Sequence, residues 1–242
     1  MADYMVGGAV APGGLAALFG SGLADSTSDP QSSAPWPTAI VNREISVNDT
    51  TSAPLFQVSP GQINFQVPSG ANIGQNSISV RVADTSELLA GGALLVAANS
   101  PGFFTLSQDG KGQAAARNQD GITVNGPANP APRGSVISLY GTGQGQVSPA
   151  VADGTGAPAS PPAMTVAVPT SDAKTCLQQQ PSVCVAIASS FANIQFSGLA
   201  PNYVGLWQLN VQIPMDAPTG PAVPVRVVIN STTSNLFTIA IK

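Results

Sequence analysis

The amino-acid sequence predicts an all-β protein built from two tandem immunoglobulin-like β-sandwiches. Three observations lead to this prediction: short runs of β-branched or alternating apolar residues, turn residues at intervals of roughly 8–12 positions, and a motif that occurs twice. The chain has 242 residues, of which 43% are apolar, so it can bury a hydrophobic core.

The expected strands are short and lie between turn signals such as Asp109-Gly110 and Asp153-Gly154. A helix over residues 87–98 is disfavoured because the segment contains Gly91-Gly92, so we expect a turn there and a strand only at its end. The expected strands cover residues 73–82, 93–97, 135–140, 164–168, 183–187, 223–229 and 237–241.

The repeated motif has the form Gln-φ-Asn-φ-Gln-φ-Pro, where φ is apolar. It occurs as QINFQVP at residues 62–68 and as QLNVQIP at residues 208–214. Upstream of these copies, APGGLAALFGSG at residues 11–22 resembles APRGSVISLYGTG at residues 131–143. The second copy is longer between its two motifs, and the additional residues contain both cysteines.

This repeat sets the expected domain organisation. We expect a first sandwich over residues 1–100 and a second over residues 131–242. Residues 101–130 are expected to form a hairpin-rich connector that packs on the second copy.

Alternation along the repeated strands assigns a face to each residue. Trp207, Leu209 and Val211 share one face, which must be the core face. The amide side chains share the other face, which we expect to lie on the outside of each copy as a solvated surface or as a contact with another copy or module. The predicted amide faces are formed by Gln62, Asn64 and Gln66, and by Gln208, Asn210 and Gln212.

The only two cysteines of the chain, Cys176 and Cys184, lie eight positions apart with Pro181 between them. This spacing favours a loop-closing disulfide, which implies an oxidising compartment. The alternative is a pair of unconnected thiols. Two cysteines without any histidine do not form a usual zinc site, so no metal and no cofactor are expected.

Charge is scarce and excludes several function classes. Only 8% of the residues are charged, the net charge is −4, and no histidine is present. Nucleic-acid binding needs clustered Lys and Arg, and Ser-His-Asp or Cys-His catalysis needs histidine. No apolar run approaches the roughly 18 residues of a membrane span. The apolar segment at residues 1–22 lacks a basic region and is not read as a signal peptide, so we expect a piece of a longer exported chain.

Two aromatic residues in expected loops are candidates for stacking on sugar rings. Trp36 lies between Pro35 and Pro37, and Tyr203 follows Pro201-Asn202. The alternative for both is an aromatic side chain that closes the end of a sandwich.

The chain resembles the C-terminal domain of large, uncharacterised secreted proteins from Solibacter-type acidobacteria. The segments that carry the resemblance include VAPGGLAALFGSGLA, APLFQVSPGQINFQVP, NSPGFFT, NGPANPAPRGSVISLYGTGQGQV and FSGLAPNYVGLWQLNVQIP. The GSGL and GTGQ turns also resemble the opening of IPT/TIG immunoglobulin-like domains. The resemblance implies tandem modules at the end of exported proteins and supplies no catalytic residue, and the cysteine-bearing insertion around residues 171–190 departs from it.

These observations together predict a non-enzymatic structural or adhesive module, located outside the cell or at its surface. Its expected partners are other modules of the same exported protein or like copies, with polysaccharide as a further candidate. The alternative function is a carbohydrate-binding module that uses Trp36 and Tyr203. A third is a hydrolase that uses two of the 12 Asp and Glu residues as paired carboxylates.

Overall fold

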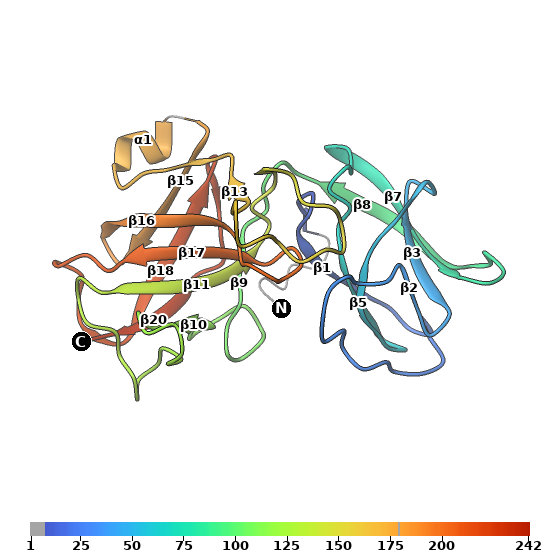
Figure 1. The fold of residues 1–242 in the computed structure, drawn as a ribbon, viewed down its shortest axis with the longest axis horizontal. Helices are drawn as coiled ribbons and strands as arrows, with labels where there is room; N and C mark the ends of the chain where they lie inside the picture. The colour runs from blue at the N-terminus through green and yellow to red at the C-terminus, as the bar shows by residue number, and fades with distance from the viewer. Residues whose placement is uncertain (1–7, 179) are drawn as a thin grey trace.

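The computed structural model describes residues 8–178 and 180–242 and confirms the all-β sandwich prediction. The strands form two groups, with the N-terminal strands on the right of Figure 1 and the C-terminal strands on the left. We call residues 8–100 the first half, and residues 101–178 and 180–242 the second half. Residues 1–7, which begin the apolar N-terminal segment, lie outside the described residues.

Two antiparallel sheets form the first half. One has the strand order β1-β6-β5, and the other has the order β2-β3-β7-β8 with β4 paired to β3. The strands are β1 (Leu15–Phe19), β2 (Ala39–Ile40), β3 (Arg43–Val47), β4 (Thr51–Ser52), β5 (Leu55–Val58), β6 (Gln62–Gln66), β7 (Gly74–Val82) and β8 (Leu88–Val96).

In the second half one sheet follows the order β10-β11-β17-β16-β15-β18-β19. It turns around the core at β16, where residues 190–192 pair with β15 and residues 193–199 pair with β17. The strands are β9 (Gly102–Phe103), β10 (Ala116–Arg117), β11 (Val136–Thr142), β12 (Val147–Ser148), β13 (Met164–Thr165), β14 (Val168–Pro169), β15 (Ser182–Ile187), β16 (Ser190–Leu199), β17 (Trp207–Gln212), β18 (Gly220–Ile229), β19 (Thr232–Thr233) and β20 (Phe237–Ile241).

Each half has its own hydrophobic core, and the repeated strands supply the centre of each. Ile63 and Phe65 of β6 are buried in the first core, and Trp207 and Leu209 of β17 are buried in the second, as the alternation predicts. The indole N–H of Trp207 donates a hydrogen bond to the Ser197 hydroxyl at 3.2 Å, so its one polar group is satisfied inside the core. The expected connector contributes to the second core through Phe103, Ala114 and Ala116.

The two halves pair their central strands in the same register. Phe19 of β1 lies opposite Gln62 of β6, and Tyr140 of β11 lies opposite Gln208 of β17. These pairs are equivalent in the repeated sequence, because APGGLAALFGSG and QINFQVP in the first half match APRGSVISLYGTG and QLNVQIP in the second. The common register supports the tandem interpretation, which stays a prediction.

A β-bulge also recurs at the equivalent place. In β5 the register shifts between Leu55 and Gln57 opposite β6, and in β16 it shifts between Ile194 and Phe196 opposite β17. A bulge turns an additional residue toward the outer face of its sheet, so both halves present an additional side chain there.

The segment at residues 87–98 differs from the sequence prediction. The turn expected at Gly91-Gly92 is absent, because both glycines pair with β7 inside the continuous strand β8, opposite Ser79 and Ile78. The expected strand at residues 164–168 is two short strands, β13 and β14, which pair with different neighbours.

The cysteine-bearing insertion contains a short helix, α1 (Ala173–Gln178). The disulfide between Cys176 of α1 and Cys184 of β15 is present, as predicted from the spacing. At the start of the helix, the Thr175 backbone N–H donates to the Asp172 carboxylate at 2.6 Å. In the described part of the chain no helix is long and apolar enough to cross a membrane.

Hydrogen bonds join the two halves near the middle of the molecule, between the strand groups of Figure 1. The Leu15 N–H donates to the Thr142 hydroxyl at 2.6 Å, and the Ser100 N–H donates to the Gly143 carbonyl at 2.8 Å. Gly143 has a φ of +80°, and a Cβ built on it would lie 1.6 Å from the Ser100 carbonyl oxygen. Only glycine therefore permits this close approach of the two backbones.

A matched pair of glycine substitutions tests this junction. Gly22 is the equivalent of Gly143 in the repeat, has a φ of +67° and has open space around its Cβ position. We expect Gly22→Ala to lower the free energy of unfolding by about 1 kcal/mol through backbone strain, and Gly143→Ala to lower it by at least about 3 kcal/mol because the Ser100 backbone must also move. Chemical denaturation measures both, and equal losses would contradict the described junction.

Candidate functional site

A cleft of about 1870 Å³ lies beside the three-stranded sheet of the first half and extends to loops of the second half. We call the part of its lining that the outer face of β1 and β6 forms the floor; past the edge strand β1 the lining continues onto core-side residues such as Ala16, Leu18 and Ile78. Gln62 and Asn64 of β6 line the cleft, as do Ala17 and Phe19, which lie opposite Asn64 and Gln62 on β1. The cleft therefore contains two of the three amides predicted to form an outer face in the first copy.

The two amides of the floor bond to each other and keep hydrogen-bonding capacity toward the cleft. The Gln62 Nε2 donates to Asn64 Oδ1 at 2.6 Å. Within the described part of the chain, Gln62 Oε1 and Asn64 Nδ2 have no other protein partner. The floor thus offers one acceptor and one donor side by side, and a hydroxyl group can use both.

One wall consists of two aromatic rings from the first half. The rings of Trp36 and Phe56 lie 5.0 Å apart between centroids and are tilted by 43°. The loop that carries Trp36 is bonded to β5, because the Leu55 N–H donates to the Pro37 carbonyl at 2.7 Å and the Gln31 N–H donates to the Phe56 carbonyl at 2.9 Å. The indole is half-buried and its position is set by the sheet.

A second wall is a turn of the second half that carries Tyr203. Tyr203 is 58% exposed and lines the cleft together with Asn202. The turn is held by Ala157, whose N–H donates to the Tyr203 carbonyl at 3.0 Å and whose carbonyl accepts from the Asn202 N–H at 2.8 Å. The structure therefore brings Trp36 and Tyr203, the two candidates predicted for sugar stacking, to one cleft.

Gln66 forms hydrogen bonds to both halves, and its burial differs from the sequence prediction of an exposed amide. It is 5% exposed and does not belong to an exposed face. Its Oε1 accepts a hydrogen bond from the Gly154 N–H at 2.7 Å, and its Nε2 donates to the Gly13 carbonyl at 3.1 Å. The Gly154 carbonyl in turn accepts from the Trp36 N–H at 2.8 Å. A loop of the second half covers this end of the face, and alternation within one strand does not reveal that.

The other predicted amide face lies elsewhere. Gln208, Asn210 and Gln212 are half-buried on the outside of β17, in the second half, and do not line the cleft. Sequence reasoning also missed Phe56, because the β-bulge after Leu55 breaks the alternation that would have assigned it to a face.

The lining of the cleft is uncharged. Among the described residues that line it there is no Asp, Glu, Lys, Arg or His, and Tyr203 is the only ionisable side chain. Low-dielectric walls without charge favour a ligand that is itself uncharged. In the described part of the chain no group of three or more His, Cys, Asp or Glu side chains is placed to hold a metal ion.

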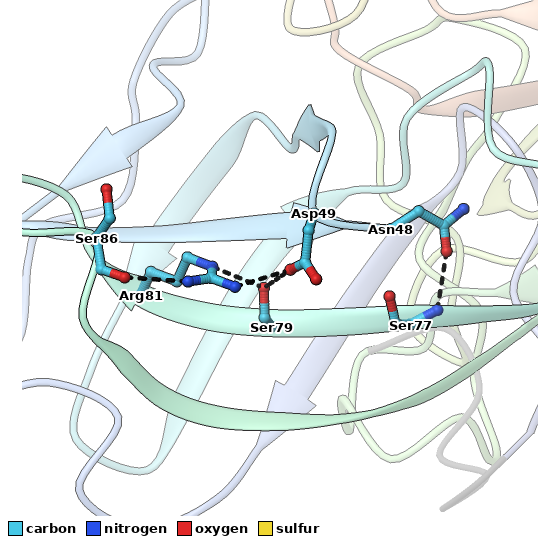
Figure 2. Close-up of polar contacts among 6 residues, drawn as sticks. All are labelled: Asn48, Asp49, Ser77, Ser79, Arg81 and Ser86. Carbon is cyan, nitrogen blue, oxygen red and sulfur yellow. Dashed lines mark hydrogen bonds and ion pairs between the residues drawn. The ribbon is translucent and has the colours of Figure 1, made fainter.

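A cluster of polar side chains lies outside the cleft, where the β3–β4 turn meets β7 (Figure 2). Asp49 Oδ1 accepts from the Arg81 guanidinium at 2.9 Å and from the Ser79 hydroxyl at 3.1 Å. Beside it, Asn48 Oδ1 accepts from the Ser77 N–H at 2.9 Å. The hydrogen bond from Arg81, and then that from Ser79, hold the pKa of Asp49 below its ordinary value of 3.8. The cluster connects two strands, which is a structural role.

Other carboxylates are used in the same way within turns. A hydrogen bond from the Ser107 hydroxyl lowers the pKa of Asp109, one from the Thr123 hydroxyl lowers that of Asp120, and one from the Thr175 backbone N–H lowers that of Asp172. These three acids stay ionised and hold local backbone structure.

Comparison with known proteins gives only distant similarities. No protein-family model and no curated protein matches the chain. The mixed-linkage glucan utilization locus protein SGBP-B of Bacteroides ovatus, solved with a mixed-linkage heptasaccharide, is 12% identical with a TM-score of 0.38, over 97% of this chain and 42% of that chain. An endo-fucoidan hydrolase of glycoside hydrolase family 107 is 12% identical with a TM-score of 0.19, over 83% of this chain and 24% of that chain. The chain thus spans less than half of either protein, and similarity at this level does not inform on ligand or activity.

The contribution of the Gln66–Gly154 hydrogen bond to stability can be tested, because the second copy of the repeat supplies a matched control residue. Gln212 is the equivalent of Gln66. Its Nε2 donates to the Gly134 carbonyl at 3.2 Å as that of Gln66 does to Gly13, but none of the described residues donates to its Oε1. We expect Gln66→Ala to cost about 1–3 kcal/mol more free energy of unfolding than Gln212→Ala, because the buried Gly154 N–H loses its acceptor. Equal losses in urea denaturation would show that the bond does not fasten the halves.

The Asp49 cluster predicts a pH dependence. The pKa of Asp49 is lowered in the folded state, so its interaction with Arg81 stabilises the protein above the unfolded-state pKa and is lost as the pH falls through the folded-state pKa. We expect Asp49→Asn to lower the melting temperature at pH 7 by about 1–3 °C, and the difference from the wild type to shrink as the pH falls below the ordinary Asp pKa of 3.8. Asp84→Asn, which removes a carboxylate without a hydrogen bond to described residues, is the control; a difference for Asp49→Asn that is independent of pH would contradict the prediction.

Proposed function

We propose that the chain is a non-catalytic module of an exported protein that binds a neutral polysaccharide in the cleft between its halves. The observation that carries this proposal is the arrangement of the lining: Trp36 with Phe56 on one wall, Tyr203 on the other, and the amides of Gln62 and Asn64 on the floor.

This arrangement matches the chemistry of a sugar ring. A pyranose has apolar C–H faces that stack on aromatic rings and a rim of hydroxyl groups that both donate and accept hydrogen bonds. Trp36 and Tyr203 supply aromatic rings, and Gln62 Oε1 and Asn64 Nδ2 supply an acceptor and a donor in the same cleft. Concave sites with aromatic walls and few polar groups are the usual form of small-ligand sites.

The uncharged lining favours neutral over acidic polysaccharides. Uronate and sulfate groups need cationic partners, and the described lining contains no Lys or Arg. Paired carboxylates for glycoside hydrolysis would also have to lie outside the described lining, since it contains no Asp or Glu. Binding without hydrolysis is therefore the activity that this cleft favours.

The proposal is compatible with an adhesive role. A module that binds polysaccharide holds its parent protein on that polysaccharide, and the Cys176–Cys184 disulfide supports an oxidising, extracellular location. The purely structural role predicted from the sequence needs no ligand, whereas an adhesive role of this kind depends on the aromatic residues of the cleft.

Binding to soluble neutral polysaccharides tests the proposal. We expect binding to at least one of xylan, glucomannan, β-glucan and amylopectin by affinity electrophoresis or calorimetry. Trp36→Ala and Tyr203→Ala are each expected to weaken it at least tenfold, because each removes a stacking ring worth about 1.4 kcal/mol or more. Tyr203→Phe keeps the ring and should retain most of the affinity.

Ile122→Ala serves as the control, since Ile122 is 81% exposed and does not line the cleft. Unchanged affinity in Trp36→Ala, or failure to bind all four polymers, would overturn the proposal. Preferential binding to alginate or polygalacturonate, with an affinity that falls steeply with salt, would also contradict the neutral ligand class.

A further inference from the structure

The second half presents a face that is equivalent to the floor of the cleft. On β11, β17 and β16, Tyr140 lies opposite Gln208, Ser138 lies opposite Asn210, and Phe196 lies opposite Asn210 on the other side. These strands lie side by side at the front of the left group in Figure 1. We call this surface, formed by Ser138, Tyr140, Phe196, Gln208 and Asn210, the β17 face.

The amides of the β17 face repeat the hydrogen bond seen in the cleft. Gln208 Nε2 donates to Asn210 Oδ1 at 2.8 Å, and the Ser138 hydroxyl donates to the same oxygen at 3.0 Å. Gln208 Oε1 and Asn210 Nδ2 have no other protein partner among the described residues. The β17 face therefore keeps the same adjacent acceptor and donor as the floor of the cleft.

Two aromatic rings flank these amides. Tyr140 and Phe196 are both half-buried and lie on the two strands that border β17. Gly198 makes room for the second ring, because a Cβ at Gly198 would lie 2.9 Å from Cζ of Phe196. The Phe196 ring thus lies along its strand, and the phenol of Tyr140 stands on the other side of Gln208 and Asn210.

The β17 face is uncharged like the cleft. The sequences of β11, β17 and residues 193–199 of β16 contain no Asp, Glu, Lys or Arg. Arg117 of β10 lies opposite Ser138, so its exposed side chain projects on the same side of the sheet and places one charge at the edge of the β17 face. A neutral ligand meets no desolvated charge on this surface.

We propose that the β17 face is a second binding site for neutral polysaccharide. This inference rests on the function proposed for the cleft for its ligand class, and on the amide and aromatic groups of the β17 face for its location. The cleft has walls from the loops at residues 31–37 and 200–206, whereas the β17 face belongs to the sheet surface itself. It fits an extended chain laid across the strands, and the two sites together would hold one polymer at two points.

Two sites on one chain predict a difference between short and long ligands. Once one site holds a polymer, the second binds at a high effective concentration, so affinity for the polymer exceeds affinity for a fragment that occupies one site. Loss of either site should then weaken polymer binding strongly while leaving fragment binding at the other site unchanged.

The experiment uses the full chain with xylan, glucomannan, β-glucan and amylopectin and with the hexasaccharide of each. We expect two hexasaccharides per wild-type chain in calorimetry, and one per chain in both Tyr140→Ala and Trp36→Ala. Each single variant should bind the polymer at least tenfold more weakly, and the double variant should not bind. Tyr140→Phe should restore the second site, which separates loss of the ring from loss of folding, and Ile122→Ala should behave as the wild type.

The outcomes distinguish the two proposals. One hexasaccharide per wild-type chain, with binding lost in Trp36→Ala and unchanged in Tyr140→Ala, would overturn the second site and leave the cleft intact. Binding lost in Tyr140→Ala and unchanged in Trp36→Ala would overturn the cleft and support the β17 face. Absence of binding to every probe would overturn both.

Discussion

The alternation of apolar and amide side chains along β6 and β17 is the constraint on which both halves depend. One face of each strand supplies the centre of a core, with Phe65 in the first half and Trp207 in the second. The other face must then be polar, and it is built from Gln and Asn. Because amides carry donors and acceptors but no charge, these outer faces can contact a neutral partner at little desolvation cost.

Properties that depend on a single strand or a short loop could be predicted from the sequence. The burial of Trp207 and the Cys176–Cys184 disulfide are examples, since each follows from spacing within a few residues. The cleft could not be predicted in this way, because long-range backbone hydrogen bonds, from Trp36 to Gly154 and from Ala157 to Tyr203, position the two loops that line it. The burial of Gln66 has the same cause.

The strand β8 shows how tertiary pairing overrides a local signal. Two adjacent glycines predict a turn, but hydrogen bonding along the whole of β7 keeps Gly91 and Gly92 extended. Backbone, amide and hydroxyl groups hold the halves together, along with one carboxylate, that of Asp153, which accepts from the Ser69 N–H at 3.0 Å. Among the described residues the ion pairs are Arg43 with Asp25 and Arg81 with Asp49, and both lie within the first half.

The origin of the cleft walls has a thermodynamic consequence. Trp36 belongs to the first half and Tyr203 to the second, and the bonds of Gly154 to Gln66 and Trp36 hold them at their separation. A ligand that contacts both rings binds only when the halves are docked, so by mass action it stabilises the docked form in proportion to the logarithm of its concentration. A polymer bound to both rings would thereby also protect the protein from opening and from proteolysis that depends on opening.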